Sequence, residues 1–161
     1  MSEIPSSMRA ELQAWNNGAG IELDGWIGCE GRFSLAVGYA SIFCPEFIEF
    51  EGYILIGEEM NEDGIRTLRE FEAGMKSSPM SIEWTLNHLH IADIQYRGCP
   101  DATPDKLLAV GTALKKIYEA RLAYLFPTKP CVVEFYVPDN PEDLHEYQIS
   151  FWQKKHEQDH A

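Results

Sequence analysis

The sequence predicts an α+β fold in which four to five helices cover a small antiparallel sheet of about three strands. Apolar residues recur at helical spacing in five stretches, and β-branched and aromatic residues are concentrated in three shorter ones. No internal repeat and no linker rich in Pro, Ser or Gly divides the 161 residues. We therefore expect one globular domain that spans residues 1–161.

The first helix is predicted at residues 7–16, where Met8, Leu12 and Trp15 share one face. Five glycines between Gly18 and Gly31 then leave the segment unassigned, although we expect its apolar residues to reach the core: Ile21, Leu23, Trp26 and Ile27. The pattern of Leu35, Tyr39 and Ile42 favours a helix over residues 32–43, while the conformation of residues 19–44 as a whole stays open.

Residues 47–56 alternate in polarity and are predicted to form a single strand with Glu49 and Glu51 on one face. Asn61 opens a helix whose buried stripe consists of Ile65, Leu68, Phe71 and Met75. Ser78 and Pro79 are typical of an N-cap and a first helical position, so they predict a helix that runs to about His88.

The carboxyl-terminal third predicts one long helix and a hairpin. Thr103 and Pro104 begin a helix that ends before Pro127 and spans about 33 Å. Residues 131–137 and 147–152 flank a turn-forming loop and are predicted to pair as antiparallel strands. Within these elements, Cys131, Trp84 and Phe151 are expected in the core.

The charge is negative and uneven along the chain. The protein has 26 acidic against 13 basic residues, and residues 1–65 hold twelve carboxylates with only Arg9 and Arg32. A field of one sign repels phosphate backbones and anionic membranes and favours encounter with cationic surfaces. We therefore expect no nucleic acid and no membrane as a ligand, and a protein partner with a basic surface.

The four cysteines lie far apart without a Cys-x-x-Cys pair, which is typical of reduced thiols in a cytosolic chain. Residues 1–17 lack the basic start and apolar core of a translocation signal, and no run of 18 apolar residues follows. The sequence therefore predicts a cytoplasmic protein without a membrane anchor.

His88, His90 and Asp93 form the most metal-like cluster, because imidazoles and a carboxylate are ligands that Zn²⁺ or Fe²⁺ accept. Two imidazoles that are two residues apart on a continuous helix point about 200° away from each other. They converge only if the segment is extended or the helix ends between them. The alternative interpretation is one imidazole in a cap or a buried hydrogen bond and one in solvent.

Glu49 and Glu51 would lie about 7 Å apart on one strand face, a separation at which one carboxylate raises the pKa of the other. The same alternation is also that of any half-exposed sheet. Aromatic residues on the same faces predict an acidic and aromatic partner-binding surface made of Phe47, Glu49, Glu51, Tyr53, Glu134 and Tyr136.

Four segments together resemble a group of small uncharacterised bacterial single-domain proteins: residues 43–53, 87–90, 125–127 and 147–153. The resemblance spans most of the chain. It implies a standalone bacterial domain, and it assigns no activity, cofactor or site residue.

The preferred functional hypothesis is an acidic protein-interaction module that is inhibitory or immunity-like toward a basic protein and needs no cofactor. Bacterial immunity proteins that neutralise basic nuclease toxins share its size and charge. One alternative is a metal-dependent hydrolase that uses His88, His90 and Asp93, with Glu49 or Glu51 as general base. Another is a homodimer paired through the edge of the terminal hairpin. A nucleophile elbow, a phosphate loop and a dinucleotide fingerprint are all missing from the sequence.

Overall fold

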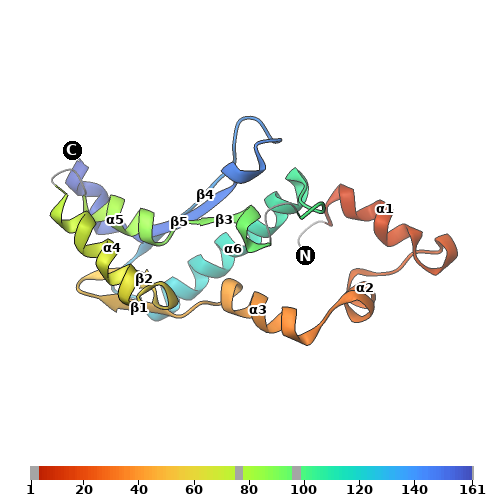
Figure 1. Cartoon of the computed structure of the whole chain (residues 1–161), viewed down its shortest axis with the longest axis horizontal. Coiled ribbons are helices and arrows are strands. Elements are labelled where there is room, and N and C mark those ends of the chain that lie inside the picture. The colour runs from red at the N-terminus through yellow and green to blue at the C-terminus, as the bar shows by residue number, and fades with distance from the viewer. Residues whose placement is uncertain (1–3, 75–77, 96–98, 161) are drawn as a thin grey trace.

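The computed structural model describes residues 4–74, 78–95 and 99–160 and confirms the α+β class. Figure 1 shows a body of helices and strands from which an arm of three helices extends and returns. The helices are α1 (Ser6–Ala14), α2 (Leu23–Glu30), α3 (Phe33–Phe43), α4 (Glu62–Ala73), α5 (Pro79–Leu86) and α6 (Pro104–Leu125). The strands are β1 (Phe47–Phe50), β2 (Tyr53–Ile56), β3 (Leu89–His90), β4 (Cys131–Tyr136) and β5 (Gln148–Gln153).

Local signals placed several of these helices correctly. The side chain of Asn61 accepts from the N–H groups of Asp63 and Gly64 and caps α4, and Ser78 caps α5 in the same way. The predicted helix over residues 32–43 is α3, and the long predicted helix is α6. Met75, predicted on the buried stripe of α4, lies outside the described residues. No helix in the described ranges is long and apolar enough to cross a membrane.

The prediction of one strand over residues 47–56 is wrong, because the segment folds back on itself as a hairpin. Glu51 and Gly52 take positive φ values of 51° and 93°, the conformation of a two-residue turn that suits the twist of paired strands. Phe50 therefore pairs with Tyr53, and β1 and β2 form a two-stranded antiparallel sheet. Glu51 lies in the turn and does not share a strand face with Glu49.

The second sheet has the order β3-β5-β4, with antiparallel pairing throughout. It contains the predicted carboxyl-terminal hairpin, in which Val133 pairs with Phe151 and Tyr136 with Gln148. The structure adds β3 on the opposite edge of β5, so β4 is an edge strand.

Helix α6 packs on the second sheet and forms the core with it. Phe47 from β1 stands edge-on to the rings of Tyr118 and Phe151, with both pairs of ring centroids 5.2 Å apart. Gly111 allows the close approach of α6 to β4, since a Cβ atom there would lie 2.2 Å from the ring of Phe135. Phe151 is buried as predicted, whereas the prediction of an exposed Phe47 is wrong because its ring joins the two sheets within this core.

Two buried polar side chains, one on α5 and one at its C-cap, connect the two sheets. Asn87 donates from Nδ2 to the carbonyl oxygens of Ile54 in β2 (2.9 Å) and Phe151 in β5 (3.1 Å). One turn earlier, the carboxylate of Glu83 accepts from the backbone N–H groups of Ile54 (2.8 Å) and Gln153 (2.7 Å). These side chains supply the hydrogen-bond partners that a neighbouring strand would otherwise give to the facing backbones.

Candidate functional site

The two carboxylates that were expected to form an acidic surface are neutralised by cations from later in the chain. Glu49 pairs with Lys129, and Glu51 accepts from Arg69 through Nη1 (2.5 Å) and Nη2 (2.6 Å). The hydrogen bonds from the Arg69 guanidinium lower the pKa of Glu51. The negative surplus of residues 1–65 is therefore compensated at both positions by basic residues from later in the chain.

The six residues of the predicted partner-binding surface do not share one face. Phe47 is in the core, and Tyr53 is half-buried against the ring of His156, with a centroid distance of 6.3 Å. Burial, with a smaller contribution from Glu72, raises the pKa of Tyr53. Glu134 and Tyr136 are exposed on β4. At the other end of this hairpin, Gln153 of β5 pairs with Cys131 of β4 and donates from Nε2 to Gly52 O in the β1–β2 turn (2.7 Å).

His88 and His90 converge because α5 ends at Leu86 and an extended segment follows. Their ring centroids are 4.5 Å apart, and His88 also stacks on Trp84 with a centroid distance of 5.0 Å. His88 Nε2 pairs with the side-chain oxygen of Gln148 (3.1 Å), and His90 Nδ1 pairs with a backbone carbonyl (2.5 Å). Burial, and then the neighbouring His90, lowers the pKa of His88.

Metal ligation by His88, His90 and Asp93 therefore stays a prediction from the sequence. Across residues 4–74, 78–95 and 99–160, no group of three or more His, Cys, Asp or Glu side chains is placed to hold a metal ion. His88 takes the hydrogen bond that the alternative interpretation gives to one imidazole, whereas His90 is also hydrogen-bonded and partly buried and does not lie free in solvent.

The amino-terminal arm, which we define as residues 4–44, is the part of the structure whose side chains are least covered. Leu12 is the only buried residue within this range. Phe33 and Val37 on α3 are 93% and 72% exposed. Ile27 on α2 and Leu35 on α3 are 54% and 50% exposed. The expectation that the glycine-rich segment brings Ile27 to the core is wrong, because α2 lies out on the arm (Figure 1).

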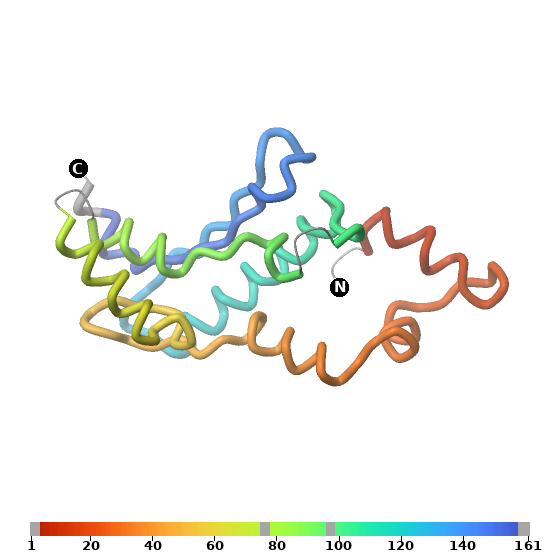
Figure 2. Tube along the Cα trace, viewed as in Figure 1, coloured from red at the N-terminus to blue at the C-terminus, as the bar shows by residue number. Residues whose placement is uncertain are grey.

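The arm is attached to the body at both ends. At its start, Ser7 donates to the carboxylate of Asp105 from its backbone N–H (2.8 Å) and from its hydroxyl (2.8 Å). A hydrogen bond from Thr103, together with those from Ser7 and Ser6, holds the pKa of Asp105 well below its ordinary value. At its end, Tyr118 Oη donates to the carbonyl of Ile42 (2.9 Å). Figure 2 follows the chain out from the first attachment and back to the second.

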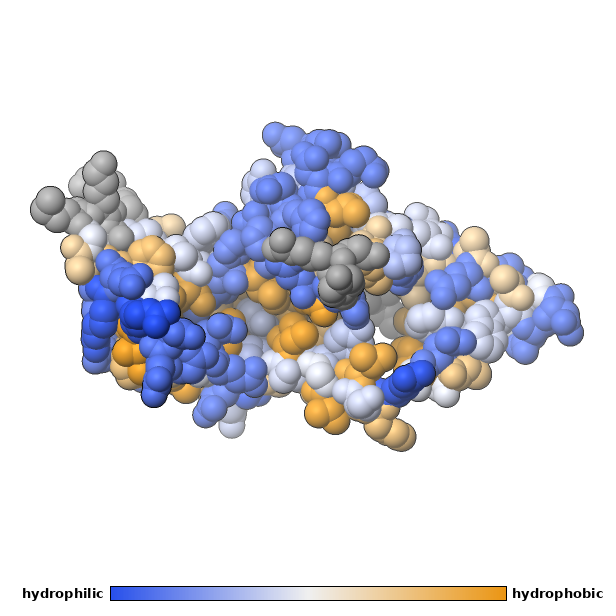
Figure 3. Space-filling view, viewed as in Figure 1, coloured by the Kyte–Doolittle hydropathy of each residue, from blue (hydrophilic) through white to orange (hydrophobic). Residues whose placement is uncertain are grey.

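Helix α3 is mainly apolar and carries no charged side chain, which sets it apart from an ordinary surface helix. Residues 33–43 contain no charged side chain. The space-filling view in Figure 3 shows hydrophobic residues gathered along this stretch of the lower edge. A solvent-facing helix normally carries a polar face, so the exposed apolar side chains of α3 are unusual for a surface helix.

Trp26 on α2 carries a buried hydrogen-bond donor without an acceptor among the described residues. Its indole Nε1 is buried and has no hydrogen-bond partner within the described part of the chain. Buried tryptophan N–H groups normally find an acceptor, because an unpaired donor costs free energy.

A groove with carboxylates lies beside the carboxyl-terminal end of α3. Its volume is about 450 Å³, and its lining includes Ser41, Ile42, Glu58, Glu59 and Asp63. Asp63 pairs with Arg66 at 2.8 Å, whereas Glu58 and Glu59 are exposed and have no Lys or Arg partner in the described ranges. The groove therefore offers negative charge next to the apolar helix.

Comparisons of the chain with family models, with curated proteins and with solved structures found no match. The apolar arm and the neighbouring acidic groove are thus identified by their geometry and chemistry. Sequence reasoning located the helix at residues 32–43 but did not predict the exposure of its apolar side chains, although the absence of any charge in it was a visible signal.

Proposed function

We propose that this protein is an interaction module whose amino-terminal arm binds a protein partner through α2 and α3. The observation that carries the proposal is the exposure of the apolar side chains on these two helices, above all Phe33 and Val37. The acidic groove at the end of α3 supports a partner that carries Lys or Arg beside its apolar contact surface.

The energetics favour a covered arm. Ordering one residue costs about 1 to 2 kcal/mol, and helices shorter than about 12 residues are marginal in water on their own. Burial of Phe33, Leu35 and Val37 would contribute about 3 to 6 kcal/mol in total, at roughly 1.5 to 3 kcal/mol for each fully exposed side chain scaled by its exposed fraction. The loss of translational and rotational freedom on association costs about 4 kcal/mol or more, so binding also needs the attraction between the acidic groove and a basic partner.

The charge favours a basic partner over a second copy of the chain. Each copy carries a formal net charge of −13, so two copies repel each other at long range. A basic protein is attracted by the same field and reaches the apolar surface faster. Our proposal includes an inhibitory, immunity-like role, because an acidic domain that covers a basic functional surface blocks access to it.

The test uses two synthetic amphipathic helices with the same leucine face, one with lysines and one with glutamates on the polar face. Isothermal titration with the full chain should show binding of the lysine peptide only, weakened when salt is raised from about 50 to about 500 mM. Val37→Ser should weaken this binding about tenfold, since it removes a contact of about 1.5 kcal/mol. Val137→Ser, at an exposed apolar residue beyond the end of β4, is the matched control and should leave the affinity unchanged.

Three results would overturn the proposal. One is the absence of binding for both peptides, and another is equal binding by wild type and Val37→Ser, which would indicate unspecific attraction by charge. The third comes from sedimentation of the free chain: a dimer that disappears in Val37→Ser would show that a second copy covers the arm.

A further inference from the structure

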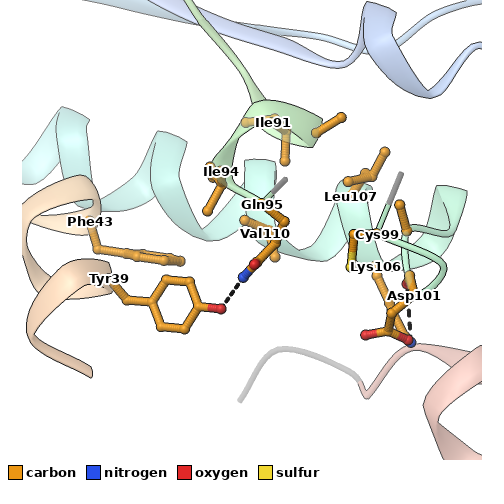
Figure 4. Close-up of a pocket in the computed structure, with 12 residues that line it drawn as sticks. Tyr39, Phe43, Ile91, Ile94, Gln95, Cys99, Asp101, Lys106, Leu107 and Val110 are labelled. Carbon is orange, nitrogen blue, oxygen red and sulfur yellow. Dashed lines mark hydrogen bonds and ion pairs between the residues drawn. The ribbon is translucent and has the colours of Figure 1, made fainter. Parts of the chain in front are cut away.

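A second cavity, separate from the acidic groove, lies between α3, the turn at Ile91–Ile94 and the first half of α6. Its volume is about 350 Å³, at the lower end of the range for small-molecule sites. Figure 4 shows Tyr39 and Phe43 entering from α3, with Ile94 and Val110 between them and the start of α6. The walls are thus mainly aromatic and aliphatic.

Polar groups are confined to two places in this cavity. On the α3 side, Gln95 Nε2 donates to the hydroxyl of Tyr39. On the other side, the ammonium group of Lys106 contacts the carboxylate and the backbone carbonyl of Asp101, the latter at 3.3 Å. Figure 4 shows that these two pairs lie at opposite ends of the lining. The cavity therefore has an apolar middle and the ion pair of Lys106 with Asp101 at one end.

We propose that this cavity binds a small amphiphile with a carboxylate head group and an apolar body, and that Lys106 recognises the head group. The volume accommodates roughly a dozen non-hydrogen atoms at about 30 Å³ each. Aliphatic and aromatic walls accept an alkyl chain without leaving polar groups unpaired.

Lys106 is the cationic group in this lining that can donate to an anionic head group. Its side chain is only 17% exposed, while its partner Asp101 is 69% exposed. An ammonium group has three N–H donors, and in the described residues Asp101 occupies two of them with its carboxylate and carbonyl. The third donor has no partner among the described residues and can donate to a ligand carboxylate.

The binding test compares decanoate with decanol, which share the alkyl chain and differ in the head group. Isothermal titration of the full chain should show tighter binding of decanoate. Lys106→Met keeps the apolar stem of the side chain and should weaken decanoate binding about tenfold while leaving decanol binding unchanged. Lys116→Met, on an exposed position of α6, is the matched control and should leave both unchanged.

Alkylation of the cysteines locates the ligand in the wild-type protein. Cys99 lines the cavity, whereas Cys29 is exposed on α2. Saturating decanoate should slow the alkylation of Cys99 at least threefold and leave Cys29 unchanged, as measured by mass spectrometry of the digested protein. Absence of decanoate binding, binding without protection of Cys99, or equal loss of affinity in Lys106→Met and Lys116→Met would each overturn the proposal.

Discussion

Replacement of Glu83 by glutamine tests whether the buried carboxylate holds the two sheets together. Its two oxygens accept four hydrogen bonds: from the backbone of Ile54 (2.8 Å), from the backbone and side chain of Gln153 (2.7 and 2.6 Å), and from His156 Nδ1 (2.9 Å). Glutamine keeps one carbonyl oxygen and replaces the other by an amino group, which donates and cannot accept.

The cost follows from counting the donors that lose their acceptor. With the amide NH₂ group of the new glutamine in place of the oxygen that faces His156 and the Gln153 backbone, the backbone N–H of Gln153 meets a second donor and is left unpaired. An unpaired buried donor costs about 1 to 3 kcal/mol, and charge-assisted bonds that become neutral lose about 1 kcal/mol more. We therefore expect Glu83→Gln to lower the free energy of unfolding by about 3 kcal/mol, a large part of the 5 to 15 kcal/mol typical of a domain.

Urea unfolding monitored by circular dichroism measures this loss. With a slope of about 2 kcal/mol per M, the midpoint should fall by about 1.5 M. Glu49→Gln is the matched control, because its ion pair with Lys129 lies at the surface and contributes at most about 1 kcal/mol. A midpoint for Glu83→Gln within about 0.3 M of the wild type, or equal to that of Glu49→Gln, would refute the reasoning.

Three further predictions concern α6, a histidine and the arm. Gly111→Ala should destabilise the protein by about 1 to 3 kcal/mol in urea unfolding, because the new Cβ would clash with the ring of Phe135 at 2.2 Å and the gain in helix propensity is only about 1 kcal/mol. Burial lowers the pKa of His88 below its ordinary 6.5. The unfolded chain therefore binds more protons at this residue, and the free energy of unfolding declines as the pH falls through 6.5. The stability advantage of wild type over His88→Gln should shrink between about pH 7.5 and 5.5. Asp105→Ala removes the acceptor that holds the start of α1, so limited proteolysis with trypsin should cut after Arg9 several times faster.

Each of these has a matched control on the same chain. Gly38→Ala lies in α3 with no atom within 4 Å of the new Cβ and should be neutral or slightly stabilising. His145→Gln changes an exposed loop histidine, and the comparison with His88→Gln fails if both variants show the same pH dependence. Asp139→Ala removes an exposed loop carboxylate, and tryptic cleavage in the arm at the same rate as in Asp105→Ala would contradict the role given to that anchor.

The sequence alone specified the elements whose causes are local. Ser78 and Pro79 gave the start of α5, Asn61 gave the start of α4, and the spacing of apolar residues gave α3 and α6. The carboxyl-terminal hairpin was also predictable, because two β-rich stretches flank a turn-forming loop. The turn at residues 51–52 was missed, since Glu-Gly is a weaker turn signal than Asn-Gly or Asp-Gly and the alternation continues across it.

For the candidate site, the sequence showed which segments are apolar or acidic, and the tertiary structure decided which of their side chains are exposed or paired. The absence of charge in residues 33–43 is a sequence fact, but whether such a helix lies in the core or in solvent depends on what packs over it. The negative surplus of the first 65 residues is likewise a sequence fact. Its effect at Glu49 and Glu51 was cancelled by Lys129 and Arg69, which are distant along the chain and adjacent in space.

The same distinction explains Glu83 and Phe47. By position, Glu83 is an ordinary acidic residue on a helix, and Phe47 is one of several aromatic residues on a strand with an exposed face. Folding placed Glu83 among four donors from three separate segments and placed Phe47 between Tyr118 and Phe151. Propensity and periodicity act over a few neighbouring residues and so fix helices and strands, whereas burial and pairing depend on contacts between segments that only the assembled fold brings together.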